Sequence, residues 1–191
     1  MAQTQKGKKN LAIYLALLIG IFATVVSVAF YVGSNSGAKV TADVPRPTPA
    51  PNMCASNTSS GKLVLVSISR QHMWSCQGTA MVEQSAVTTG ATVVPNNVND
   101  ATPLGTWHIY EKFRNLYLKG SDANGPWNDY VQYWMPFDVA VGFHDASWQT
   151  IPFGSSQYRT QGSHGCVQLP TSTAAWLYNW APVGTTVTVT A

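Results

Sequence analysis

The sequence predicts a mainly β domain, a β-sandwich or barrel-like arrangement of short strands with one or two short helices. The first observation is a series of short apolar and β-branched runs after residue 60, separated by turn residues. The second is the alternation of valine with threonine over residues 185–190. The third is a single helical pattern close to the C-terminus. Many short strands with frequent turns favour packed sheets over a helical bundle.

An uncharged apolar stretch, residues 11–32, predicts a single transmembrane helix. Its 22 residues exceed the roughly 20 that a helix needs to cross a bilayer. Three lysines lie within residues 1–10, so we expect this tail in the cytoplasm and everything after Val32 outside it. The alternative is a cleaved signal peptide, whose apolar region is usually shorter, about 7–15 residues. In either case the domain is exported.

A spacer is expected over residues 33–60, which are rich in Ser, Asn, Thr and Pro. Prolines at alternate positions favour an extended, semi-rigid segment, which would separate the membrane from a domain spanning residues 61–191. Cys54 precedes the first expected strand and Cys76 lies near the end of the second. An oxidising compartment permits these two cysteines to pair, and two free thiols are the alternative.

The basic charge of the chain belongs to its N-terminal flank. Residues 1–60 carry five basic side chains and one acidic side chain, a net charge of +4, whereas residues 61–191 carry six basic and seven acidic ones, a net charge of −1. The domain therefore has no basic surface of the kind that binds nucleic acid.

Within the domain, apolar strand patterns alternate with turns. Residues 63–68 form a β-branched run typical of a buried strand, and residues 74–82 continue it with a turn at Gln77 and Gly78. Further strands are expected over residues 86–92, 105–113, 139–143 and 185–190. Residues 114–136 contain Gly, Asn, Asp and several aromatic residues; they are either a lid over a cleft or aromatic cover for the core.

The helical pattern covers residues 172–180 and ends before Pro182 and Gly184. Thr171 or Ser172 is expected to cap its start. Because this helix begins a few residues after Cys166, we expect its packing to hold the segment around that cysteine in place.

The candidate chemistry lies between residues 143 and 170. Cys166 follows Ser163-His164-Gly165, and His144 stands at the end of an expected strand. An imidazole that removes the proton of a thiol produces the reactive thiolate, so we interpret Cys166 as a nucleophile and His144 as its general base. His164 is the second candidate for the base. Ser163, Gly165 and the backbone of Cys166 are expected to form an oxyanion hole, since glycine allows a sharp turn.

The order His144, a loop, then Ser163-His164-Gly165-Cys166-Val167 resembles the signature of the L,D-transpeptidase catalytic domain (YkuD-like) family. Supporting matches span roughly residues 61–191: Ser67 to Trp74, Thr88-Thr89-Gly90, Thr102-Pro103-Leu104-Gly105 and Tyr133 to Phe137. Gln168 departs from the pattern, because the family usually carries Arg or Asn there.

The resemblance implies a β-sandwich of mixed sheets and a cysteine acyltransferase that acts on peptidoglycan stem peptides. It implies a thioester on Cys166, release of D-alanine from a tetrapeptide, a 3→3 cross-link and acylation by carbapenem-type β-lactams. It also implies that the main-chain carbonyl of Asp145 orients His144 and that His164 shapes the site. Substrate contacts are expected at Tyr133, Trp134 and, with less support, Gln168. The domain would face the cell wall from the cell membrane.

Other functions stay open at this point. Water as the acceptor would make the protein an L,D-carboxypeptidase, and a silent wall-binding module would bind stem peptides without turnover. A sortase- or papain-like protease shares the Cys/His pair, but a sortase fits poorly because the last arginine, Arg159, precedes Cys166. No metal and no cofactor are expected, since zinc-type spacings, phosphate loops and paired carboxylates are missing from the sequence. The sequence predicts no oligomeric state.

Overall fold

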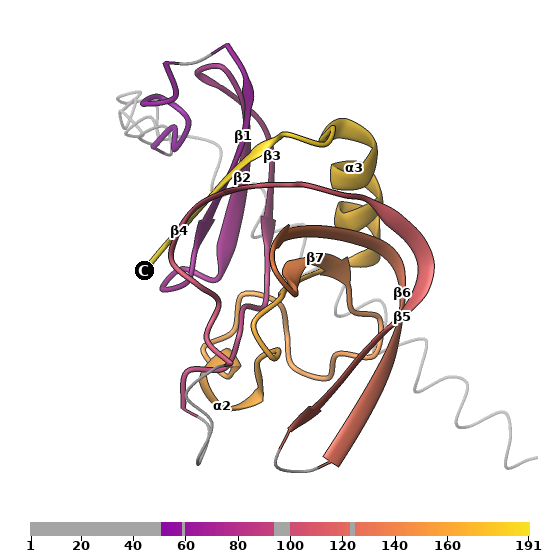
Figure 1. Ribbon diagram of the computed structural model, residues 1–191. Coiled ribbons are helices and arrows are strands. Elements are labelled where there is room, and N and C mark those ends of the chain that lie inside the picture. The colour runs from indigo at the N-terminus through magenta and orange to yellow at the C-terminus, as the bar shows by residue number, and fades with distance from the viewer. Residues whose placement is uncertain (1–50, 59, 94–99, 123–124) are drawn as a thin grey trace, which may run out of the picture. The chain divides into compact units, whose positions relative to one another are not determined.

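A computed structural model describes residues 51–58, 60–93, 100–122 and 125–191 of the chain (Figure 1). In these residues the first sheet has five strands in the order β3-β2-β1-β9-β4. Strands β1 and β9 are parallel, and the other neighbours are antiparallel. The strand bounds are Lys62–Ser67 for β1, His72–Gln77 for β2, Ala80–Ala86 for β3, Gly105–His108 for β4 and Thr186–Thr190 for β9.

The second sheet of the described residues has four strands in the order β5-β6-β7-β8. In this sheet β7 and β8 are parallel, and the other neighbouring strands are antiparallel. The described residues also include the helices α2 and α3, and Figure 1 shows the β5–β6 hairpin extending well beyond β7. The mainly β fold with mixed sheets is thus confirmed. The bounds are Phe113–Asp122 for β5, Gly125–Asp138 for β6, Val141–Asp145 for β7, Val167–Leu169 for β8, Tyr158–Gln161 for α2 and Thr171–Trp180 for α3.

The core lies between the two sheets and α3, because strand alternation directs one set of side chains inward. In β9 the valines are buried and the threonines between them are not, as the alternating sequence predicts. Both sheets and α3 contribute to one cluster of buried side chains: Val64, Val66, Met73, Val87, Ile109, Met135, Phe137, Phe143, Val167, Leu169, Ala174, Leu177, Ala181, Val187 and Val189.

Several predicted boundaries were wrong. Residues 114–136, which we interpreted as a lid or as aromatic cover without assigning strands to them, form most of a long hairpin, β5–β6. The expected strand over residues 86–92 is an extended segment joined to other elements by two isolated bridges. The strand expected over residues 139–143 begins and ends two residues later, so His144 lies within β7 rather than after it. The expected strand over 105–113 is split between β4 and the start of β5.

Helix α3 begins one residue earlier than predicted, and its N-cap is Pro170, with no side-chain hydrogen bond. The prediction of a cap by Thr171 or Ser172 was therefore wrong. At the other end, the ammonium of Lys62 donates to the carbonyl of Trp180, and that of Lys112 donates to the carbonyls of Tyr178 and Ala181. Cations at this end of a helix satisfy carbonyls that have no partner in the helix and complement its dipole.

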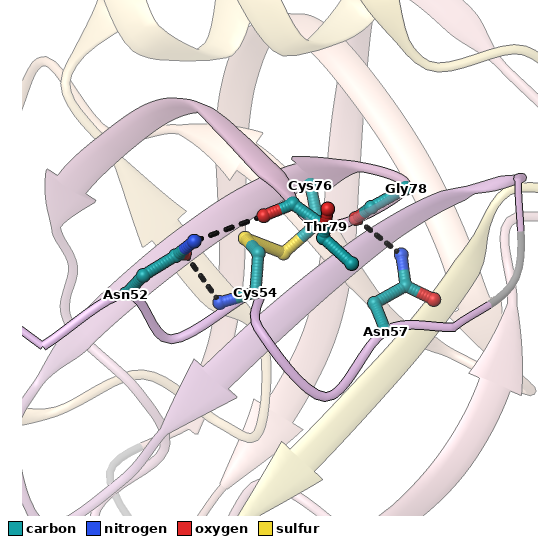
Figure 2. Close-up of a disulfide and its surroundings, with 6 residues drawn as sticks. All are labelled: Asn52, Cys54, Asn57, Cys76, Gly78 and Thr79. Carbon is teal, nitrogen blue, oxygen red and sulfur yellow. Dashed lines mark hydrogen bonds between the residues drawn. A yellow bond between two sulfur atoms is a disulfide. The ribbon is translucent and has the colours of Figure 1, made fainter.

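A disulfide joins Cys54 to Cys76, with Cα atoms 5.5 Å apart (Figure 2). It holds residues 51–58 against the β2–β3 turn. Two asparagines reinforce the attachment: the Asn52 side chain donates to the carbonyl of Thr79, and the Asn57 side chain donates to that of Gly78 (Figure 2). The last residues of the expected spacer are thus fixed to the domain.

The expected transmembrane segment, residues 11–32, lies outside the described residues, as do the tail and most of the spacer. Within the described part of the chain, no helix is long and apolar enough to cross a membrane.

Candidate active site

The parallel pairing of β7 with β8 brings the two halves of the predicted site together. Phe143 pairs with Val167 and His144 with Gln168, so Cys166 stands directly before β8 and beside the start of β7. Phe143 and Val167 are fully buried in the core. Because side chains alternate along a strand, His144, Cys166 and Gln168 share the opposite face. All three line one cleft of about 620 Å³.

The imidazole of His144 has a fixed orientation. Its Nδ1 lies 2.9 Å from the main-chain oxygen of Asp145. A carbonyl oxygen only accepts, so Nδ1 carries the proton and the Nε2 lone pair is left as the proton acceptor. The Asp145 carboxylate has a structural role instead. It accepts the backbone N–H groups of Gln132 and Tyr133 on β6, each at 2.9 Å, and so connects β7 to β6.

Two tryptophans enclose the His144 ring. Trp134, its partner on β6, has its ring centroid 6.0 Å away, and Trp148 stacks on it at 5.9 Å with an interplanar angle of 15°. His144 is only 4% exposed. Burial lowers the pKa of His144 below its usual value, against the opposing effects of the Asp145 carbonyl and the charges of Asp145 and Asp129. The ring is therefore neutral at neutral pH and ready to accept a proton.

Cys166 is the free cysteine of the described residues. Burial raises the pKa of its thiol to about 11, although a hydrogen bond from the Gly142 backbone lowers it in part. The sulfur lies 3.8 Å from the carbonyl oxygen of Ala140, to which the thiol can donate. At pH 7 a thiol with this pKa is mainly protonated. The neutral imidazole of His144, in the same cleft, is therefore available to take the proton of the thiol.

The segment before Cys166 is held by its own polar groups. The Ser163 hydroxyl donates to the carbonyl of Cys166 at 2.5 Å and accepts the N–H of Gly165 at 3.1 Å. Gly165 has φ +114°, a backbone conformation that favours glycine, and an added Cβ would lie 3.3 Å from Val141. The Ser163 hydroxyl and the Gly165 N–H are thus used within the loop. The backbone N–H of Cys166 makes no backbone hydrogen bond within the described residues.

A buried threonine fixes this loop to the rest of the domain. The Thr102 hydroxyl donates to the carbonyl of Gly165 at 2.8 Å and accepts the N–H of Gly90 at 2.9 Å. Gly90 has no room for a side chain, because a Cβ there would lie 1.8 Å from the carbonyl oxygen of Asp100. The carbonyl of Thr89 accepts the N–H of Ser163 at 3.1 Å. Residues far apart in the sequence therefore determine where Cys166 stands.

The β5–β6 hairpin forms a wall of the cleft. Its residues Leu118, Gly120, Trp127 and Asp129 line the hollow that contains Cys166 and His144. Trp127 stacks on His164 with centroids 4.9 Å apart and an interplanar angle of 6°. A second hollow of about 200 Å³ adjoins the first and shares four lining residues with it: Asp129, Ser163, His164 and Gln168.

Comparison with known proteins agrees with this geometry. The family model of the L,D-transpeptidase catalytic domain (YkuD) matches residues 61–189. This chain belongs to the L,D-transpeptidase catalytic domain family.

Individual relatives share this domain. The probable L,D-transpeptidase 3 of Mycobacterium tuberculosis is 30% identical over 95 residues, which are 46% of this chain and 34% of that protein. The crystal structure of Enterococcus faecium L,D-transpeptidase is 30% identical with a TM-score of 0.61, covering 68% of this chain and 50% of the other. The catalytic domain of the E. faecium enzyme acylated by ertapenem is 31% identical with a TM-score of 0.57, and the match covers 69% of this chain and 98% of that domain. The chain thus spans about a third of the curated relative.

Most residues predicted from the L,D-transpeptidase signature meet at the cleft. Its lining includes His144, Cys166, Ser163, His164, Trp134 and Gln168. Tyr133 does not line it: its ring packs against Tyr178 of α3, with Arg114 over its face. Residues 114–136 do contribute to the cleft, as one of the two interpretations of that segment expected. Thr102 was missed as a site residue, although the Thr-Pro-Leu-Gly match contained it.

Proposed function

We propose that this chain is a peptidoglycan L,D-transpeptidase that forms 3→3 cross-links through a thioester on Cys166. The observation that carries the proposal is the pairing of β7 with β8. It places the free cysteine and a histidine with a fixed proton-accepting nitrogen on the same face, in the same cleft. The family of the chain and the E. faecium domain acylated by ertapenem support an acyl transfer with carbapenem-type β-lactams as inhibitors.

In the first half-reaction, the sulfur of Cys166 attacks the carbonyl carbon between the third stem residue and the terminal D-alanine. His144 Nε2 takes the thiol proton while the S–C bond forms, because a free thiolate is scarce at a pKa of about 11. The Cys166 N–H stabilises the oxyanion of the tetrahedral intermediate. When the C–N bond breaks, His144 returns the proton to the departing amine of D-alanine.

In the second half-reaction, a side-chain amine of a neighbouring stem attacks the thioester carbon. The C–S bond breaks, and the amine proton passes through His144 to the sulfur. The product is a 3→3 cross-linked dimer and the free thiol. Water in place of the amine gives the L,D-carboxypeptidase reaction, so the two activities differ only in the acceptor.

The proposal includes the location of the enzyme. Residues 11–32 would anchor the chain in the cell membrane, and the domain would face the cell wall. The disulfide between Cys54 and Cys76 supports an oxidising compartment outside the cytoplasm.

Mass spectrometry of muropeptides tests the proposal. We expect the full chain, incubated with a disaccharide-tetrapeptide, to yield a dimer that lacks one D-alanine, and Cys166→Ala to yield none. Tripeptide without dimer would assign the carboxypeptidase reaction. Unchanged tetrapeptide that nevertheless binds to the protein would make the chain a binding module and refute the proposal.

A further inference from the structure

A single carboxylate stands where the two hollows of the cleft meet. Asp129, on β6 opposite Leu118, lines both the larger hollow with Cys166 and the smaller one beside it. The described residues that line the smaller hollow include no second carboxylate and no lysine or arginine. Asp129 is therefore the one carboxylate among the described residues that line the smaller hollow.

The carboxylate of Asp129 has no partner among the residues that the structure describes. Asp129 is partly buried, yet its side chain makes no hydrogen bond or ion pair with any other residue that the structure describes. Its charge acts on His144, where it favours the protonated ring. A carboxylate that lines a cleft can accept the N–H groups of a cationic ligand in charge-assisted hydrogen bonds, which are stronger than those between neutral groups.

We propose that Asp129 is the residue that recognises the acceptor, by binding the ammonium group of the incoming side-chain amine. The inference rests on the proposed transpeptidase function and assigns its amine selectivity to one side chain. Lys119, on the neighbouring strand, lines only the larger hollow, so an amine that enters through the smaller hollow meets Asp129 without a competing lysine.

The chemistry balances as follows. The amine binds as an ammonium ion, loses one proton to water, and attacks the thioester carbon as the neutral amine. The C–N bond forms, the C–S bond breaks, and the second proton passes through His144 to the Cys166 sulfur. Because the carboxylate favours the ammonium form, Asp129 raises the local concentration of the amine and fixes its position. The effect is therefore expected in the KM for the amine and not in kcat.

Two nucleophiles of different charge test the assignment. With the acyl-enzyme formed from a tetrapeptide donor, the probes are Nα-acetyl-lysine amide, an ammonium ion at pH 7, and methoxyamine, which is neutral. In Asp129→Asn we expect the rate with the lysine probe, relative to methoxyamine, to fall about tenfold at low concentration, as for the loss of one charge-assisted hydrogen bond. Any effect through His144 lowers both rates and leaves their ratio unchanged. An unaltered ratio would overturn the proposal.

A matched variant controls for the general charge of the cleft. Glu111 is an exposed carboxylate that lines the larger hollow only. Glu111→Gln removes the same charge, and we expect it to leave the ratio of the two rates within twofold of the unmodified chain. An equal fall in both variants would mean that Asp129 contributes only to the overall field, and would contradict a binding role.

Binding without chemistry separates this inference from the proposed function. NMR titration of the full chain carrying Cys166→Ala with Nα-acetyl-lysine amide requires no acyl-enzyme. We expect Asp129→Asn to weaken that binding about tenfold and Asp129→Glu, which keeps the charge, to retain most of it. If the unmodified chain forms no acyl-enzyme, the transpeptidase proposal fails, and this titration still decides whether Asp129 binds the amine. Equal affinity with and without the carboxylate would refute the inference.

Discussion

Thr102→Val removes one hydroxyl that connects the Cys166 loop to the segment around Gly90. Valine has nearly the same volume as threonine, so the change leaves no cavity. It does leave the N–H of Gly90 and the carbonyl of Gly165 without their partner, in a place where Thr102 is 2% exposed. Each buried polar group that loses its partner costs about 1–3 kcal/mol. We therefore expect the free energy of unfolding to fall by about 2–6 kcal/mol.

Thermal unfolding measures this loss. For the 132 residues that the structure describes, that destabilisation corresponds to a fall in Tm of roughly 7–22 °C. Thr102→Ser keeps the hydroxyl and is expected to lose much less. Because the loop positions the nucleophile, acylation of Cys166 should also slow in the valine variant. A valine variant as stable as the unmodified chain, or a serine variant as unstable as valine, would refute the reasoning.

Three further predictions concern other features. Asp145→Ala removes the single carboxylate oxygen, Oδ1, that accepts both β6 N–H groups, and it should cost about 2–4 kcal/mol of unfolding free energy. Asp145→Asn, which keeps an oxygen there, should cost less, and equal losses in chemical denaturation would contradict the role of the oxygen. Replacing Cys54 and Cys76 by serine opens a loop with a sequence separation of 22, so we expect a loss of about 3 kcal/mol in the same assay, with acylation retained. Because burial raises the pKa of the Cys166 thiol to about 11, the rate at which iodoacetamide alkylates Cys166 should rise about tenfold per pH unit between pH 7 and pH 9. A rate that is already constant near pH 7 would indicate a preformed thiolate and contradict this prediction.

The fold class was predictable because its signals are local. Alternation of valine and threonine determines which face of β9 is buried, and the turn at Gln77 and Gly78 was visible as a break between two apolar runs. The β5–β6 hairpin was not recognised as strands, because it is long, contains many polar residues and shows no regular alternation of apolar with polar residues. Such a hairpin is stabilised by cross-strand pairing, which one stretch of sequence does not reveal.

The site was predictable in part, for a related reason. Cys166 and His144 were found from residue chemistry and from the family signature, and both line the cleft. Asp129 and Trp148 have no local motif; only the folding of separate segments brings them to the cleft and to the His144 ring. Tyr133 illustrates the opposite error, since it lies next to a cleft residue in the sequence but on the other face of its strand, against α3.

The direct test of the central claim is the intact mass of the full chain over time after addition of a carbapenem. We expect one covalent adduct, located on Cys166 by peptide mapping, and none on Cys166→Ala. Without the imidazole that takes the thiol proton, His144→Gln should acquire the same adduct at least about 100-fold more slowly. An adduct on Cys166→Ala, or an unchanged rate in His144→Gln, would contradict the account.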